Sequence, residues 1–448
     1  MTLNKVMDYL EQNIGIVLLI LFIYCFKLET FSLPVCWDES IYFTPVTFDH
    51  GIMAFLPGYY NPEAYHGHPF LLQVFLLFSS YVFGTNTFSA HFIAFLSFAY
   101  FLIIANTFIK QFIDKKAALA IILFFTGLPF VFVHSTTFIP NYLMIAFALH
   151  SYVHYLNHNY KKYVIFAFLS VMTRESAIAF CMYPLLETAY QFLKKQVKFT
   201  KVLYTLVPFI SLVLFFIYNK ITSDNSDLIN HPYVKTRIKN DEFQWQKIMN
   251  TIDDSLSVLE NATLQFTHSL FFILFFLVLI YLAYKTFRKK EFNFKFNNAY
   301  ALLITAALGF CAFFLLYGDT IPRDFTFVTF VYALLLMIPL SLLIKKEILL
   351  IIVLFNFIVN TKAHFFPWST DLAYGGFYQR IFLFKDIANI INERYADKHW
   401  IKCTWPCTRL FERPEYGYVN DIHQTTIYDW EAHVMFKTLL SPPEPYTT

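Results

Sequence analysis

The chain has 448 residues, of which 57% are hydrophobic and 15% charged, and its formal net charge is +3. A soluble protein of this length is about one-quarter charged, so the composition excludes an ordinary soluble enzyme and indicates a polytopic membrane protein. The small net charge gives no argument for nucleic-acid binding, and six scattered cysteines exclude a disulfide scaffold.

The first apolar run, Ile14–Phe26, follows a short N-terminal segment that contains Lys5, Asp8 and Glu11. No small-residue cleavage site follows the run, so we expect an uncleaved signal anchor that forms the first span. Apolar stretches long enough to span the membrane, or nearly so, recur down to residue 363. The predicted spans are 14–31, 88–109, 117–133, 139–157, 202–219, 264–284, 299–317, 325–343 and 347–363.

The segment Pro69–Gly84 is ambiguous because a helix of this length covers only about 24 Å, less than the ~30 Å hydrocarbon core. Counting it as a span would place Lys110, Lys115 and Lys116 outside the cell and invert every later loop. The positive-inside rule therefore favours a helix that lies in the outer interface.

Lysines flank the segment Val164–Leu193 on both sides: Lys161 and Lys162 precede it, and a cluster that begins at Lys194 follows. Both flanks belong in the cytoplasm, so the segment is predicted to be a hairpin of two short helices. Its apex is Thr173–Arg174–Glu175, and charges at that depth imply a cavity that enters the membrane from outside.

These assignments predict an all-α membrane protein of about eleven transmembrane helices, with the N-terminus inside and the C-terminus outside. The transmembrane portion covers residues 1–363, and its outer loops are 34–87 and 220–263. Residues 364–448 are predicted to form a small exported α/β domain. The loop 34–87 contains no Lys or Arg, and that asymmetry is the strongest signal in the sequence.

The first outer loop carries an acidic pair, Asp38–Glu39, directly after Trp37 and before Ile41. Such a pair at the mouth of a loop is ordinarily solvated surface. Here the loop has no cation to pair with the carboxylates, and its aromatic and apolar residues would desolvate them. A carboxylate in this setting can act as a general base toward an acceptor hydroxyl.

The same loop ends in His66–Gly67–His68–Pro69, where Gly67 permits a sharp turn and Pro69 suits the first position of the following helix. The two histidines, with Asp49, could bind a divalent metal. Alternatively, they only hydrogen-bond a phosphate or the loop backbone, since His-x-His spacing alone is a weak signal.

Two further pairs of charges lie near membrane depth on the outer side, Arg174–Glu175 and Arg323–Asp324. They either form local ion pairs that steady turns or contact the substrate, because charges at this depth usually belong to a substrate path. The guanidinium group can bind two oxygens of a lipid phosphate at once.

Other polar residues give weaker predictions. His134 and Asn141 either line the same cavity or, as polar groups in spans usually do, form hydrogen bonds between helices. Cys403 and Cys407 in the exported tail could form a disulfide in an oxidising compartment.

Together these motifs resemble the GT-C glycosyltransferases, most closely the group that contains protein O-mannosyltransferases and the aminoarabinose transferase of lipid A. The acidic pair after the first span, the His68–Pro69–Phe70–Leu71 element before a juxtamembrane helix, the turn at Thr173–Glu175 and the step at Arg323–Asp324 carry the resemblance. Phe70 and Asp324 depart from the usual proline and aromatic residue. Tyr378–Asn392 followed by Trp400–Cys403 looks like the helix-then-strand opening of the exported domain in some members.

The resemblance implies a GT-C-like fold and a polyprenyl-phosphate-linked sugar donor, with inversion at the anomeric carbon and Asp38 as the base. Glu39 would orient or bind, and His66, His68, Arg174 and Arg323, with Glu175 beside them, would contact the donor. A lipid, glycan or protein hydroxyl would be the acceptor, at the outer face of a bacterial inner membrane or the lumenal face of the endoplasmic reticulum. No cofactor is required by this chemistry. The alternative function is a transporter or flippase of a lipid-linked substrate.

Overall fold

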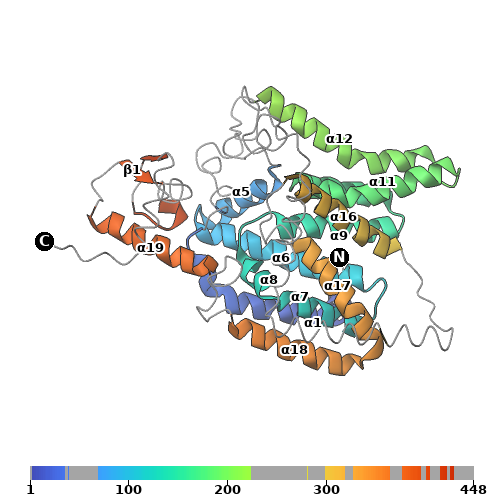
Figure 1. Ribbon diagram of the computed structural model, residues 1–448, viewed down its shortest axis with the longest axis horizontal. Coiled ribbons are helices and arrows are strands. Elements are labelled where there is room, and N and C mark those ends of the chain that lie inside the picture. Colours follow the sequence, from blue (N-terminus) through green and yellow to red (C-terminus); the bar gives the residue numbers. More distant parts are fainter. Residues whose placement is uncertain are drawn as a thin grey trace.

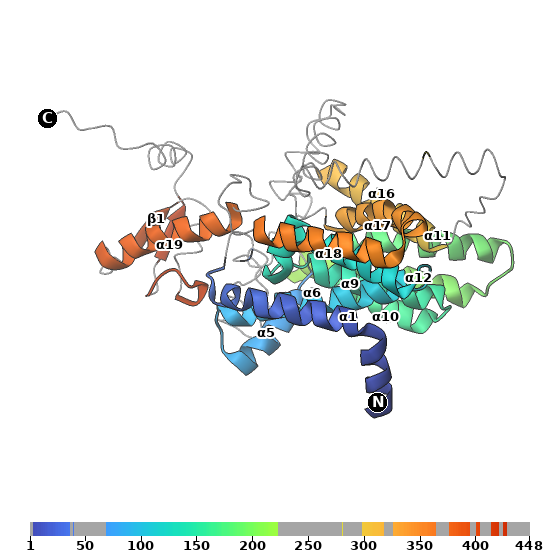
Figure 2. The ribbon, with the colours of Figure 1, turned by 90° about the horizontal axis from the view of Figure 1, so that it is seen from below.

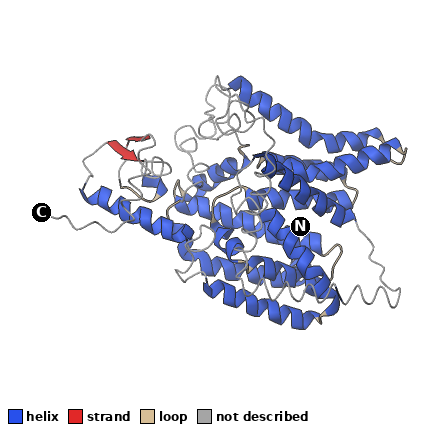
Figure 3. Ribbon diagram, viewed as in Figure 1, coloured by secondary structure: helices blue, strands red, loops and turns tan. Residues whose placement is uncertain are grey.

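The computed structural model describes residues 3–35, 39, 69–222, 280, 298–317, 326–363, 376–394, 400–403, 414–420 and 424–427. Most of this part of the chain is helical (Figure 3). The helices are α1 (Leu3–Lys27), α5 (Leu71–Phe83), α6 (Thr87–Ile109), α7 (Lys115–Thr126), α8 (Pro129–Val133), α9 (Asn141–Leu156), α10 (Tyr160–Val171), α11 (Ile178–Leu193), α12 (Phe199–Thr222), α16 (Asn298–Tyr317), α17 (Thr326–Leu343), α18 (Lys346–Ala363) and α19 (Gly376–Arg394). Short 3-10 turns are η1 (Leu28–Ser32), η3 (His134–Thr136), η4 (Glu175–Ala177) and η6 (Pro414–Tyr416), and the strands are β1 (Trp400–Cys403) and β2 (Gln424–Ile427).

The predicted spans coincide with these helices wherever the structure describes them; the span 264–284 lies, apart from Ile280, outside the described residues. One predicted span, 117–133, is divided into α7 and α8 by a turn at Gly127 and Leu128, because Pro129 cannot continue the hydrogen-bond ladder of α7. By length and apolar composition, the described segments Asn13–Ser32, Thr87–Ile109 and Phe199–Tyr218 can each cross a membrane.

The hairpin predicted between the two lysine clusters is confirmed. Helix α10 ends at Val171, the chain turns through Thr173–Arg174–Glu175, and α11 returns from Ile178 to Leu193. The turn between α11 and α12 lies at the end of the bundle farthest from α19 and β1 (Figures 1 and 2).

Helix α5 has 13 residues, about 20 Å of helix, too short to cross the hydrocarbon core. It begins at Leu71, so the prediction that Pro69 occupies its first position is wrong by two residues. The physical reason is a tertiary contact: the N–H of Leu71, one of the groups that a helix start leaves unpaired, donates to the carbonyl of Met172 at 3.1 Å. The start of α5 therefore lies against the hairpin apex.

Two lysines that the sequence predicts on the cytoplasmic side, Lys116 and Lys346, lie close together in the structure. Lys116 at the start of α7 pairs with Glu347 at 2.5 Å, and Lys346 pairs with Asp114 at 2.8 Å. These contacts join the loop before α7 to the start of α18. The predicted division of the loops into two groups, one at each end of the bundle, agrees with these contacts.

Aromatic side chains fill the core of the bundle. The rings of Phe101 in α6, Phe125 in α7 and Phe330 in α17 lie 5.4–5.5 Å apart in mutual edge or tilted contact. A second group joins α11, α16 and α17 through Phe180, Phe310 and Phe327. Helices in a membrane associate by packing rather than by a hydrophobic driving force, so these ring contacts hold the bundle together.

The C-terminal elements form a small unit at one end of the bundle (Figure 1). Strands β1 and β2 pair in parallel, with Trp400 opposite Gln424 and Cys403 opposite Ile427. The predicted helix followed by a strand is confirmed by α19 and β1. The unit contacts the start of the first outer loop, where the N–H of Val35 donates to the carbonyl of Tyr416 at 3.2 Å.

Candidate functional site

Of the two acidic residues predicted to carry the chemistry, the structure describes Glu39, whose side chain is only 1% exposed. Its Oε1 accepts a hydrogen bond from the backbone N–H of Phe138 at 2.6 Å and lies 3.3 Å from Nε2 of His91 in α6. Glu39 is therefore not part of a solvated surface; it fixes the first outer loop to the interior of the bundle.

His91 connects Glu39 to the end of the first span. Its Nδ1 lies 3.3 Å from the carbonyl oxygen of Phe31 in η1. A carbonyl only accepts, so Nδ1 carries a proton. Nε2 faces the Glu39 carboxyl group at 3.3 Å. The buried carboxyl group therefore has polar partners, which reduce the cost of removing it from water.

The short segment Phe138–Asn141, which leads into α9, also bonds to a second predicted site residue, Arg174. The side-chain oxygen of Asn141 accepts a hydrogen bond from Nη1 of Arg174 at 2.8 Å. Arg174 stands at the hairpin apex with extended backbone, just before Glu175 begins η4. One segment therefore anchors Glu39 at its first residue and Arg174 at its last.

Asn141, the first residue of α9, bonds to Arg174 in the turn between α10 and η4, so its bond joins a helix to a turn and not two helices. His134 makes a local contact instead, between Nδ1 and the hydroxyl of Thr137 at 3.2 Å. Burial, and then the positive charge of Lys27, lowers the pKa of His134 to about 3. His134 is consequently neutral at physiological pH and serves as a hydrogen-bonding group rather than as a cation.

Sequence reasoning missed two residues at this site, Lys27 and His91. The side chain of Lys27 is buried, and its Nζ lies 4.4 Å from the centroid of the Phe132 ring. Lys27 is the only Lys or Arg between Lys5 and Lys110, and it stands at the outer end of the first predicted span. The sequence alone could therefore have identified it as a candidate site residue. His91 gave no signal, because a lone histidine in an apolar helix has no distinguishing pattern.

The remaining predicted site residues lie outside the described residues: Asp38, Asp49, His66, His68, Arg323 and, for the disulfide, Cys407. The predicted metal ligands are among them. Within the part of the chain that the structure describes, no group of three or more His, Cys, Asp or Glu side chains could hold a metal ion.

No protein-family profile matches the sequence, and no curated protein matches it either. Solved structures of ArnT from Cupriavidus metallidurans do resemble the fold. The form bound to undecaprenyl phosphate is 12% identical, with a TM-score of 0.57 over 97% of this chain and 88% of that chain. The apo form is also 12% identical, with a TM-score of 0.50 over 83% of this chain and 69% of that chain. The fold that the motifs predicted is thus confirmed: this chain has an ArnT-like, GT-C membrane fold.

Proposed function

We propose that the chain is a glycosyltransferase that moves a sugar from a polyprenyl-phosphate donor to a hydroxyl group of a lipid, glycan or protein acceptor. The observation that carries the proposal is the placement of Glu39. Glu39, which is buried and next in sequence to Asp38, is bonded to the segment that also holds Arg174. The fold supports the donor class, since the ArnT structure with the higher TM-score is bound to undecaprenyl phosphate.

The two carboxylates receive different roles in this proposal. Glu39 already accepts from Phe138 and contacts Nε2 of His91 at 3.3 Å, so it positions the loop. Asp38 acts as the general base. It takes the proton of the acceptor hydroxyl while that oxygen attacks the anomeric carbon, and the bond from this carbon to the phosphate oxygen breaks on the opposite face. The sugar is transferred with inversion, and the polyprenyl phosphate leaves.

Cations at the outer end of the bundle would stabilise the negative charge of the leaving phosphate. Arg174 is one, held toward α9 by Asn141, and Arg323, His66 and His68 are others by resemblance. The side-chain amine of Lys27 is buried near η3 and would add positive charge to this end of the bundle in its protonated form. Electrostatic stabilisation by fixed charges is usually the largest contribution when an anionic group departs. The site would face the periplasm of a bacterial inner membrane.

The experiment is turnover of radiolabelled polyprenyl-phosphate sugar by the purified full-length protein, with donor affinity measured in parallel. Asp38→Asn keeps the shape of the side chain but cannot take the proton, so turnover should fall by roughly 10²–10⁴-fold. Donor affinity should stay near that of the wild type, because the base acts in the transition state.

Asp386→Asn, an exposed position on α19, is the matched control and should retain full turnover. Wild-type turnover in Asp38→Asn would remove the acidic pair from the mechanism. Binding of the donor with no sugar transfer by the wild-type protein would favour a transporter instead.

A further inference from the structure

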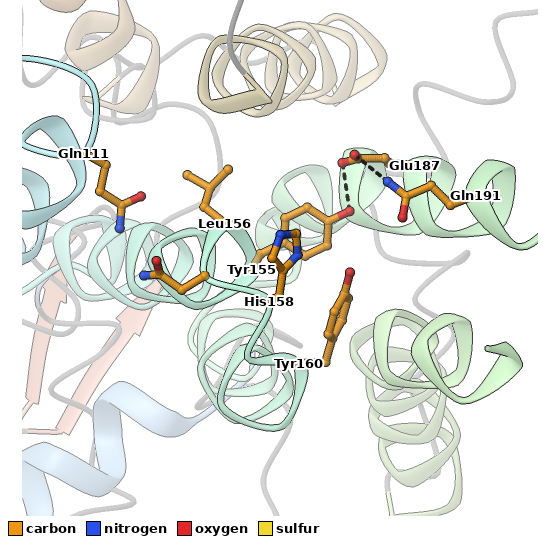
Figure 4. A pocket seen from close by; sticks show the side chains of 8 residues that line it. Gln111, Tyr155, Leu156, His158, Tyr160, Glu187 and Gln191 are labelled. Atoms are coloured by element: carbon orange, nitrogen blue, oxygen red, sulfur yellow. Dashed lines mark hydrogen bonds between the residues drawn. The ribbon is translucent and has the colours of Figure 1, made fainter. Parts of the chain in front are cut away.

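A polar pocket of about 420 Å³ lies at the end of the bundle opposite Glu39. It is formed where α9 ends, where α10 begins and along the last turns of α11, and Figure 4 shows its side chains. Gln111, which follows Lys110 at the end of α6, and His158, in the turn between α9 and α10, also line it. The pocket therefore belongs to the lysine-rich side of the protein and is separate from the proposed active site.

The acidic group of this pocket is Glu187, which is partly buried in α11. Its Oε2 accepts from the hydroxyl of Tyr155 and its Oε1 accepts from the side-chain amide of Gln191, each at 2.9 Å (Figure 4). Tyr183 also hydrogen-bonds this carboxylate. These bonds fix the carboxylate, which has about four acceptor positions in all. A charge on an otherwise apolar membrane helix is costly and generally marks a binding site.

Aromatic rings stand beside the carboxylate. Tyr155 and Tyr160 are buried, and their rings meet edge to face with centroids 5.7 Å apart. Tyr160 already holds one ammonium group, since Nζ of Lys201 lies 4.9 Å from its ring centroid. A carboxylate next to electron-rich ring faces is the arrangement that binds an organic ammonium ion.

The surroundings of the pocket carry the opposite charge. Lys161 and Lys162 extend from the first turn of α10, and Lys194, Lys195 and Lys198 occupy the turn between α11 and α12. All five are exposed. An acidic side chain in the pocket, with lysines in the segments that directly follow its lining residues Tyr160 and Gln191, matches a zwitterion that carries an ammonium and a phosphate.

Apolar side chains continue from the pocket along the surface of α11. Leu186, Tyr190 and Leu193 are 59%, 55% and 78% exposed, and they alternate with the pocket residues Glu187 and Gln191. Such a surface suits acyl chains rather than water. This continuity favours a lipid over a free amine.

We propose that this pocket binds the headgroup of an aminophospholipid from the cytoplasmic leaflet. Glu187 and the ring of Tyr155 hold the ammonium, and the lysines of the adjacent segments contact the phosphate. Lipid binding at this site would make the stability of the hairpin α10–α11 depend on the composition of the inner leaflet. The other end of this hairpin carries Arg174. It does not depend on the sugar-transfer reaction, and glycosyl transfer can be present or absent without changing it.

The test uses full-length protein in detergent and compares dioleoyl phosphatidylethanolamine, phosphatidylcholine and phosphatidylglycerol by native mass spectrometry and by the rise in thermal unfolding temperature. The ethanolamine lipid should bind most tightly, because its N–H groups donate to Glu187, which a trimethylammonium group cannot do. Glu187→Gln should reduce its affinity by about tenfold or more, since charge-assisted hydrogen bonds are the stronger ones. Binding of phosphatidylglycerol should not change.

Glu29→Gln, the same substitution at an exposed position of the opposite end, is the matched control and should bind like the wild type. Equal binding of the three lipids by the wild-type protein would overturn the proposal without the need for any variant. Stabilisation by soluble glycerophosphoethanolamine to the same degree as by the intact lipid would also overturn it, since the acyl chains would then contribute nothing.

Discussion

At the residue scale, the contact between Glu39 and His91 is the feature on which the site depends. Three elements that are distant in sequence meet there: η1 through the carbonyl of Phe31, α6 through His91, and the segment before α9 through the N–H of Phe138. Each polar atom in this chain of contacts has a partner, so the burial of a carboxyl group carries little penalty. Removing one partner leaves the other uncompensated.

The contact between Glu39 and His91 predicts that substitutions of the two residues have non-additive effects on the free energy of unfolding. His91→Leu should lower the free energy of unfolding by about 3–5 kcal/mol, because it leaves a carboxyl group buried without its partner. Glu39→Gln should cost less, since its amide oxygen still accepts from Phe138. Thermal unfolding of the two single variants and the double variant gives the coupling, expected between about 0.5 and 3 kcal/mol.

Glu29→Gln supplies the baseline for this cycle, because Glu29 is exposed near the same end of the first span. Additive effects of Glu39→Gln and His91→Leu would show that the two side chains do not stabilise each other. In that case the loop would be held by Phe138 alone.

At the scale of elements, the C-terminal unit is held against the first outer loop three to four residues before Asp38. Tyr416 is fully buried and its carbonyl accepts from Val35. The next residue, Gly417, has φ +86°, and a Cβ atom there would lie 3.2 Å from the Cα of Pro34. Glycine is therefore required both by backbone conformation and by the close approach of the two segments.

Gly417→Ala tests whether this contact matters for the site. The left-handed backbone alone should cost about 1–2 kcal/mol of stability, and the crowding of Pro34 should shift the loop and reduce sugar transfer. Gly84→Ala is the matched control, because Gly84 has φ +81° but leaves 3.6 Å between an added Cβ and its nearest neighbour. Turnover that falls equally in both variants would assign the effect to backbone strain and not to the contact with Pro34.

At the scale of the whole molecule, contacts between loops divide the protein into two ends. The first outer loop, the start of α5, the hairpin apex and the C-terminal unit form one end, joined by the bonds from Leu71 to Met172 and from Val35 to Tyr416. The lysine-bearing turns form the other, joined by the pairs of Lys116 and Lys346 with acidic partners. The positive-inside rule assigns the second end to the cytoplasm.

This orientation predicts the accessibility of the turn after α5. A single cysteine in place of Thr85, in an otherwise cysteine-free protein, should react with a membrane-impermeant thiol reagent added from outside. The reason is that α5 is too short to carry the chain across the membrane. A cysteine in place of Lys195 should react only after the membrane is opened. The reverse pattern of labelling would show that the predicted membrane orientation is wrong.

The sequence by itself determined the parts of this protein that depend on periodic or compositional signals. Apolar length located the helices, and lysine flanks located the hairpin and its apex at Arg174, because insertion into a membrane is governed by hydrophobicity and charge within each segment. The acidic pair could be recognised as a candidate site for the same local reason: it is a pair of charges in a loop with no cation.

Only the tertiary structure decided how these segments meet. The partner of Glu39 is a histidine 52 positions later in an apolar helix, and that of Arg174, in the turn before η4, is an asparagine at the start of α9. Neither pairing can be recognised from neighbouring residues in the sequence, since each arises from the packing of distant segments. The predicted start of α5 was wrong because the carbonyl of Met172 in the hairpin accepts from the first N–H of the helix. The predicted span 117–133 was wrong as a single helix because Pro129 ends the hydrogen bonding of α7, although the whole segment is apolar.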